Sequence, residues 1–120
     1  MAKILLVEDT PDNIRLFRAI LGRRGHEVVE LVSGDRLVEV ADEAKPDLVL
    51  LDIQLPGRDG YQLLSDLRQH QGDSKRVKVV ALTAHAYDVD RDRALGAGFD
   101  GYITKPIDVR DFSRQVELYL

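Results

Sequence analysis

Five short apolar runs, each followed by a stretch with helical periodicity, constrain the fold of this 120-residue chain most strongly. The runs read KILLV, EVVEL, DLVLL, VKVVAL and GYIT, at residues 3–7, 27–31, 47–51, 77–82 and 101–104. Strands that alternate with helices form a parallel sheet, because consecutive parallel strands are joined by right-handed crossovers that cover both of its faces. The alternation therefore predicts an α/β protein with a doubly wound, five-stranded parallel sheet, in a single domain spanning residues 1–120.

Helix signals follow each apolar run. The first helix is expected to start at Pro11 with Thr10 as its N-cap, because proline is well tolerated at the first helical position. Its apolar residues recur at helical spacing, at Ile14, Phe17 and Leu21. The remaining helices are expected to begin after Ser33 as N-cap and end at Pro46, to begin near Asp59, to run from around Asp88 to Leu95 and stop at Gly96 and Gly98, and to begin at Asp108.

The composition argues against several classes of protein. With 44% hydrophobic and 32% charged residues the chain is typical of a globular domain, and its net charge of −4 gives no general attraction to nucleic acid or to an anionic membrane. It has no cysteine, so disulfides and thiolate metal sites are not available. Glu8 cuts the first apolar run too early for a signal-peptide core or a membrane span, so we expect a cytoplasmic protein without direct nucleic-acid or membrane binding.

Chemically active side chains come directly after four of the five runs. Glu8 and Asp9 follow the first run, Asp52 the third, Thr83 the fourth and Lys105 the fifth. The carboxyl ends of parallel strands meet at one edge of the sheet, where the ligands of such folds bind. We therefore expect three carboxylates, one hydroxyl and one ammonium group to share a small cleft at that edge.

The residue types in this cleft favour phosphoryl chemistry on a divalent cation. Two carboxylates about 5 Å apart repel by roughly 3 kcal/mol at an effective dielectric constant near 20, so the three acids need a counter-charge. Hard oxygen ligands without histidine or cysteine favour Mg²⁺. Asp52 could then attack a phosphoryl donor as nucleophile and form an acyl phosphate, while Lys105 and Thr83 stabilise the transferring oxygens.

Four motifs in this order resemble those of the response-regulator receiver domain of two-component signalling. They read LLVEDTPDN, DLVLLDIQLPGRDGY, VVALTAHA and GYITKPID, and the likeness covers nearly all 120 residues. The resemblance implies a flavodoxin-like sheet with strand order 2-1-3-4-5. It also implies a phospho-acceptor that is served by a histidine kinase or a histidine phosphotransfer protein. Its downstream protein partner would then bind the surface of the fourth helix, fifth strand and fifth helix.

The resemblance also assigns roles around the metal. Asp52 becomes the phospho-acceptor and a metal ligand, and Asp9 a direct ligand of Mg²⁺. Glu8, which stands where the family more often has aspartate, would act on the metal through water. The backbone carbonyl of Gln54 would be a further protein ligand.

Further roles follow from the resemblance at the ends of the fourth and fifth runs. Thr83 and Tyr102 match the family's switch pair, and Lys105 matches its phosphate-contacting lysine. The likeness also implies a cis peptide bond before Pro106. The histidines of the chain share no ligand spacing, and we expect only His85 to lie near the phosphate.

Two other functions are compatible with some of these residues. A Mg²⁺-dependent phosphohydrolase could also use Asp52 as nucleophile, but such enzymes usually need a second acid two residues later, where this chain has Gln54. A receiver-like interaction module that is never phosphorylated would not need Asp9, Asp52 and Lys105 together. The sequence therefore favours a signalling phospho-acceptor that catalyses only its own phosphorylation and dephosphorylation.

Overall fold

A computed structural model describes residues 2–55, 57, 59–70, 72, 76–84, 88–105 and 107–120, with the backbone alone at 88–90. Its strands are β1 (Lys3–Val7), β2 (Glu27–Leu31), β3 (Leu48–Asp52), β4 (Lys78–Thr83) and β5 (Gly101–Thr104). All neighbouring strands pair in parallel, in the order β2-β1-β3-β4-β5. This order confirms the predicted flavodoxin-like sheet and makes β3 one of its inner strands.

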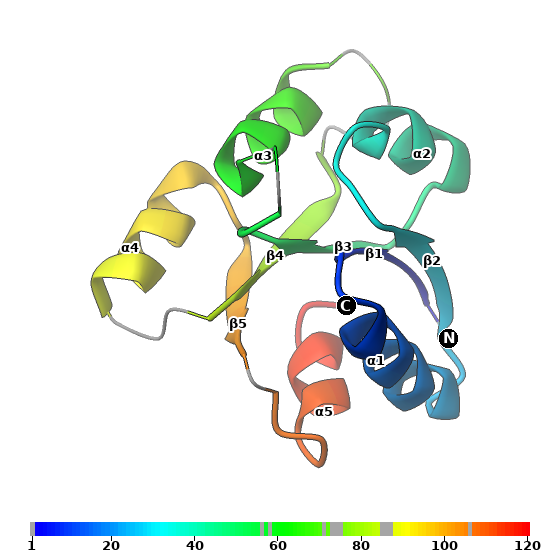
Figure 1. Ribbon diagram of the computed structural model, residues 1–120. Coiled ribbons are helices and arrows are strands. Elements are labelled where there is room, and N and C mark those ends of the chain that lie inside the picture. The colour runs from blue at the N-terminus through cyan, green and yellow to red at the C-terminus, as the bar shows by residue number, and fades with distance from the viewer. Residues whose placement is uncertain are drawn as a thin grey trace.

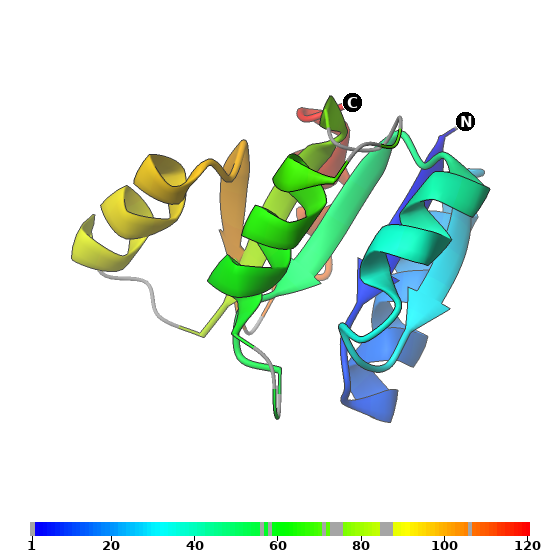
Figure 2. The same cartoon turned by 90° about the horizontal axis from the view of Figure 1, so that it is seen from above.

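Helices cover both faces of the sheet, as Figures 1 and 2 show. On one face lie α1 (Pro11–Arg23) and α5 (Phe112–Glu117), and on the other α2 (Leu37–Ala44), α3 (Gly60–Gln69) and α4 (Asp88–Ala97). Within the described part of the chain, none of these helices has the length and apolar character needed to span a membrane.

The sheet separates two apolar layers, and β3 contributes to both. Leu48 and Leu50 pack into the layer with α1 and α5, while Val49 and Leu51 pack into the layer with α2 and α3. Successive side chains of a strand point to opposite faces, so a strand between two helix layers must be apolar at every position. This constraint explains the continuous run of apolar residues that ends at Asp52.

The first helix begins and packs as the sequence predicts. Thr10 occupies the N-cap position of α1, Pro11 is its first residue, and Ile14, Phe17 and Leu21 are buried. The ring of Phe17 stacks on that of Phe112, with centroids 4.9 Å apart, which joins α1 to α5.

Two helix boundaries differ from the predictions. Ser33 is not the N-cap of α2, which begins at Leu37 after a turn that brings Gly34 against the Leu63 side chain. The last helix begins at Phe112 rather than Asp108, because the Asp108 carboxylate accepts a hydrogen bond from the Arg110 amide and forms a turn first. The fourth helix ends at residue 97, directly before Gly98, which has a positive φ, in agreement with the stop predicted at Gly96 and Gly98.

Gly60 is required by the close approach of α3 to the end of β3. Its amide donates to the carbonyl oxygen of Ile53 at 3.2 Å, and a Cβ atom at this position would lie 2.6 Å from the Ile53 Cα. The obstacle is backbone, so it cannot rotate away. The loop after Asp52 and the start of α3 therefore behave as one packed unit.

We expect Gly60→Ala to lower the free energy of unfolding by about 1–3 kcal/mol, the usual range for overpacking. Gly22→Ala is the matched control, because a Cβ there meets nothing within 4 Å and alanine is the better helix former. Urea unfolding of both variants measures the difference. A Gly60→Ala variant as stable as the parent chain would contradict the close approach.

Candidate functional site

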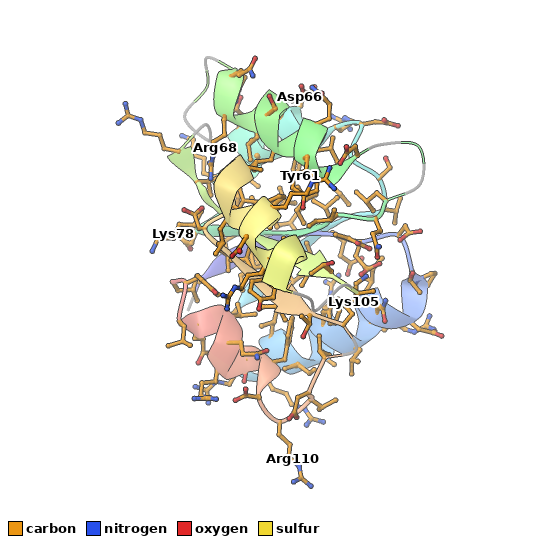
Figure 3. The ribbon with its side chains drawn as sticks, turned by 90° about the vertical axis from the view of Figure 1, so that its left-hand side faces the viewer. Tyr61, Asp66, Arg68, Lys78, Lys105 and Arg110 are labelled. Atoms are coloured by element: carbon orange, nitrogen blue, oxygen red, sulfur yellow. The ribbon has the colours of Figure 1, made fainter. Side chains whose placement is uncertain are left out.

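The polar residues predicted to share a cleft lie at the carboxyl edge of the sheet. Asp52 and Thr83 are the last residues of β3 and β4, while Glu8 and Lys105 directly follow β1 and β5. Backbone hydrogen bonds hold Glu8 and Lys105 in place. The Glu8 amide donates to the carbonyl oxygen of Leu31, and the Lys105 amide donates to the carbonyl oxygen of Thr83. Figure 3 shows Lys105 at this end of the sheet, next to α1.

The Lys105 ammonium group bridges two buried carboxylates. Its Nζ lies 3.0 Å from Glu8 Oε1 and 2.9 Å from Asp52 Oδ2. Glu8 is 0% exposed and Asp52 is 2% exposed. Buried charges are tolerated only when they are paired and hydrogen-bonded, so Lys105 compensates a repulsion that would otherwise destabilise the fold.

Backbone amides bind the second oxygen of each of these carboxylates. The Thr10 amide donates to Glu8 Oε2 at 3.2 Å, and the Gln54 amide donates to Asp52 Oδ1 at 2.9 Å. Both amides belong to the loops that follow the strands. The orientation of the two acids is therefore determined by local backbone on one side and by Lys105 on the other.

Burial and pairing shift the protonation of this cluster. Burial raises the pKa of Glu8 above its ordinary value, and the hydrogen bonds from Lys105 and the Thr10 amide only partly offset this effect. For Lys105, burial alone would lower the pKa, but the hydrogen bonds and the charge attraction of Asp52 and Glu8 together outweigh burial and raise it. Lys105 therefore remains a cation at neutral pH.

The three acids are close enough to hold one metal ion. Glu8, Asp9 and Asp52 each offer a carboxylate oxygen, and these oxygens lie within 4.8 Å of one another. An all-oxygen donor set of this kind fits a hard divalent cation such as Mg²⁺. The structure thus brings together the acids that the sequence placed in one cleft. The ligand role of the Gln54 carbonyl stays a prediction.

The expected switch pair lies on the opposite face of the sheet from the Asp52 carboxylate. Asp52 pairs with Leu82 in the parallel register, so its side chain shares the face of that leucine, which packs with α1 and α5. Tyr102 pairs with Ala81 and packs with the α2–α3 layer. Thr83 is two residues after Ala81 in β4, so its position in the strand is on that same face. Thr83 is 5% exposed.

Two of the predicted positions, His85 and Pro106, lie outside the described residues. Sequence reasoning also missed one contact, the ion pair between Glu8 and Lys105, since it assigned Lys105 only to the transferring phosphoryl group. The signal available in the sequence for this ion pair was the glutamate at position 8, because its side chain is one methylene longer than that of aspartate.

A comparison of the sequence with protein-family models decides the family. The model of the response regulator receiver domain matches residues 4–117. The chain belongs to this family. Receiver domains of response regulators accept a phosphoryl group in two-component signalling, which is the function that the cluster of acids and Lys105 led us to expect.

Relatives and solved structures of receiver domains cover almost the whole chain. The polar-differentiation response regulator DivK of Brucella ovis is 35% identical over 117 residues, which are 98% of this chain and 94% of that protein. The BeF3-activated receiver domain of Klebsiella pneumoniae RstA is 41% identical, with a TM-score of 0.84 over 98% of this chain and 97% of that one. The receiver domain of the Pseudomonas aeruginosa sensor histidine kinase PA1611 is 34% identical, with a TM-score of 0.85 over 98% and 96%.

Replacing Lys105 by methionine tests its role as counter-charge. In Lys105→Met, Glu8 and Asp52 lose their shared cation, so without divalent ions at pH 7 the free energy of unfolding should fall by about 3 kcal/mol. The loss should shrink between pH 7 and pH 5. The hydrogen bond from Lys105 lowers the pKa of Glu8, so losing Lys105 raises that pKa further in the variant. Protonation of Glu8 then restores more stability to the variant than to the parent chain as the pH falls.

Urea unfolding at both pH values, with the exposed Lys78→Met as control, measures this effect. A loss of the same size at pH 7 and pH 5, or a loss equal to that of Lys78→Met, would contradict the assignment.

Proposed function

We propose that Asp52 accepts the phosphoryl group, from a histidine kinase or a histidine phosphotransfer protein, in a reaction that depends on Mg²⁺. The observation that carries this proposal is the position of Asp52. Its carboxylate is buried at the strand end, 2.9 Å from the Lys105 ammonium group, with oxygens of Glu8 and Asp9 close by. The domain that performs this function is proposed to span residues 1–120.

The proposed reaction is an in-line displacement at phosphorus. An Asp52 oxygen forms a new bond to the phosphorus atom while the bond to the donor breaks, and the donor leaves with the electron pair. Lys105, which binds the Asp52 carboxylate in the free chain, is placed to bind a phosphoryl oxygen instead. The Thr83 hydroxyl would donate a hydrogen bond to another of these oxygens.

The acids would hold the metal beside this reaction. Asp9 and Asp52, with the Gln54 backbone carbonyl, would be direct ligands, and Glu8 would act through water. When bound, Mg²⁺ supplies positive charge beside the phosphoryl oxygens. The similarity to the PA1611 receiver domain, whose structure has a magnesium ion coordinated in the active site cleft, supports this assignment.

We further infer that the chain catalyses only its own phosphorylation and dephosphorylation. Phosphohydrolases that use such an aspartate as nucleophile usually have a second acid two residues later in the sequence, where this chain has Gln54. Water attack on the acyl phosphate would return Asp52 to its free carboxylate. The chain would then act on other proteins by binding, through the surface formed by α4, β5 and α5.

The change of that surface is proposed to start at Thr83. Asp52 and Thr83 end adjacent strands, so a phosphoryl group on Asp52 gives the hydroxyl a nearby new acceptor. If Thr83 moves toward it, space opens beside β4 on the face where Tyr102 packs. The ring of Tyr102 can fill this space, which changes the surface beside α4.

The acceptor assignment predicts that the parent chain gains one phosphoryl group, labile to hydroxylamine, with acetyl phosphate and Mg²⁺. Asp52→Asn should gain none, because the amide is a poor nucleophile, while Asp59→Asn, in the same loop, should react like the parent. Intact-protein mass spectrometry distinguishes these outcomes. Labelling that persists in Asp52→Asn, or that is insensitive to chelation of the metal, would rule out the proposal.

Thr83→Ala separates phosphorylation from the conformational response. The variant keeps Asp52, Asp9 and Lys105, so it should still bind beryllofluoride with Mg²⁺, but the backbone amide shifts of α4 and β5 should be much smaller than in the parent chain. Two-dimensional NMR of both proteins, with and without beryllofluoride, provides the measurement. Equal shifts in the two proteins would show that the hydroxyl does not transmit the change.

A further inference from the structure

A second path of contacts runs from the acceptor to α4, through residues other than Thr83 and Tyr102. We propose that Tyr61 is a positioning residue whose ring, by binding the Arg93 guanidinium group, holds α4 in the arrangement of the unphosphorylated chain. Activation of the domain then requires this contact to weaken. The inference rests on the proposed function of Asp52, and it adds a regulatory element to that function.

The Tyr61 ring makes two contacts with the segment around α4. The Cζ atom of Arg93, on α4, lies 4.4 Å from the ring centroid, which is within the range of a cation–π interaction. Phe99, which is buried just after α4, packs edge-on against the same ring, with centroids 5.7 Å apart at an interplanar angle of 81°. Figure 3 shows Tyr61 on α3, on the side next to α4.

Tyr61 is joined to the acceptor by the loop between β3 and α3. The Gln54 amide donates a hydrogen bond to Asp52 Oδ1, and the Gly60 amide donates one to the carbonyl oxygen of Ile53. Asp59 caps α3 by accepting a hydrogen bond from the Tyr61 amide at 2.8 Å. A phosphoryl group on Asp52 changes the acceptor of the Gln54 amide, so it acts directly on the loop that positions Tyr61.

Few described side chains of α4 anchor this helix in the core. Among residues 91–97, whose side chains the structure describes, Ala94 is buried and the others are exposed, including Leu95 at 44%. A buried alanine side chain removes little apolar surface from water. Among the described side chains of α4, Arg93 therefore provides, through Tyr61, one of the contacts that can fix the position of this helix.

The Tyr61–Arg93 contact biases an equilibrium between two arrangements of α4. A contact that exists in only one arrangement of α4 stabilises that arrangement by the free energy of the contact. A ligand that needs the other arrangement then binds more weakly, by the factor in affinity that corresponds to this free energy. Removing the contact should therefore tighten the binding of a phosphoryl analogue. A cation–π contact at an exposed site corresponds to about a two- to fivefold change in affinity.

The test measures the apparent affinity of the full chain for beryllofluoride at saturating Mg²⁺, by NMR titration. We expect Tyr61→Leu and Arg93→Met each to bind beryllofluoride about two- to fivefold more tightly than the parent chain. The double variant should gain no more than Tyr61→Leu, because the contact with Arg93 is already lost in that variant. Tyr61→Phe keeps the ring face and should match the parent chain.

Arg91→Met is the matched control on the same helix, because Arg91 pairs with its neighbour Asp92 at 3.9 Å. It should leave the affinity unchanged. Urea unfolding gives a second readout. Loss of the contact should lower the free energy of unfolding and raise the affinity for beryllofluoride, whereas simple structural damage should lower both the free energy of unfolding and the affinity. An unchanged or weaker affinity in Tyr61→Leu and Arg93→Met would overturn the inference.

The same titration distinguishes the two proposals. If the parent chain binds no beryllofluoride, the acceptor role of Asp52 is wrong and the role of Tyr61 falls with it. If the parent chain binds it but Tyr61→Leu and Arg93→Met bind no more tightly, only the role of Tyr61 is wrong.

Discussion

The Lys105 ammonium group lies between the carboxylates of Glu8 and Asp52, and the arrangement of the whole site depends on this shared cation. Without it, two buried acids would repel across a short distance in a medium of low polarity. With it, Asp52 is kept at the strand end with one oxygen bound to a backbone amide and the other to Lys105. A group that later brings its own positive charge to Asp52 can take over the role of Lys105 and release that side chain for new contacts.

The topology of the sheet explains why these distant residues meet. Residues 8, 52 and 105 lie far apart in sequence, but parallel strands end at a common edge, and the order β2-β1-β3-β4-β5 gathers the ends of β1, β3, β4 and β5 there. The register then divides the site between the two faces. Asp52 shares the face of α1 and α5, while Tyr102 lies on the face of α2 and α3. The proposed switch would therefore connect chemistry on one face to packing on the other through side chains at the strand ends.

Sequence patterns predict the strands and α1 well because each depends on local signals. β3 lies between two helix layers, so its residues before Asp52 are all apolar, and this run is visible in the sequence. Pro11 marks the start of α1 in the same way. Ser33 failed as an N-cap because the start of α2 depends on Gly34 packing against Leu63, a contact between distant segments. The residue types of the predicted cleft already pointed to Asp52 as the nucleophile, and the family resemblance added the expected role of Asp9 as a direct metal ligand. The contact of Tyr61 with Arg93 could not be read from the sequence, since it depends on how two helices far apart along the chain pack together.

Crystals soaked in Mn²⁺, with anomalous diffraction recorded for the manganese, test the central claim most directly. The account predicts one anomalous peak within coordinating distance of the Asp9 and Asp52 carboxylates, with Glu8 in the surrounding shell and the Lys105 ammonium group displaced from at least one of its two acids. No peak between these acids at saturating Mn²⁺, with Lys105 still bridging Glu8 and Asp52, would contradict the account.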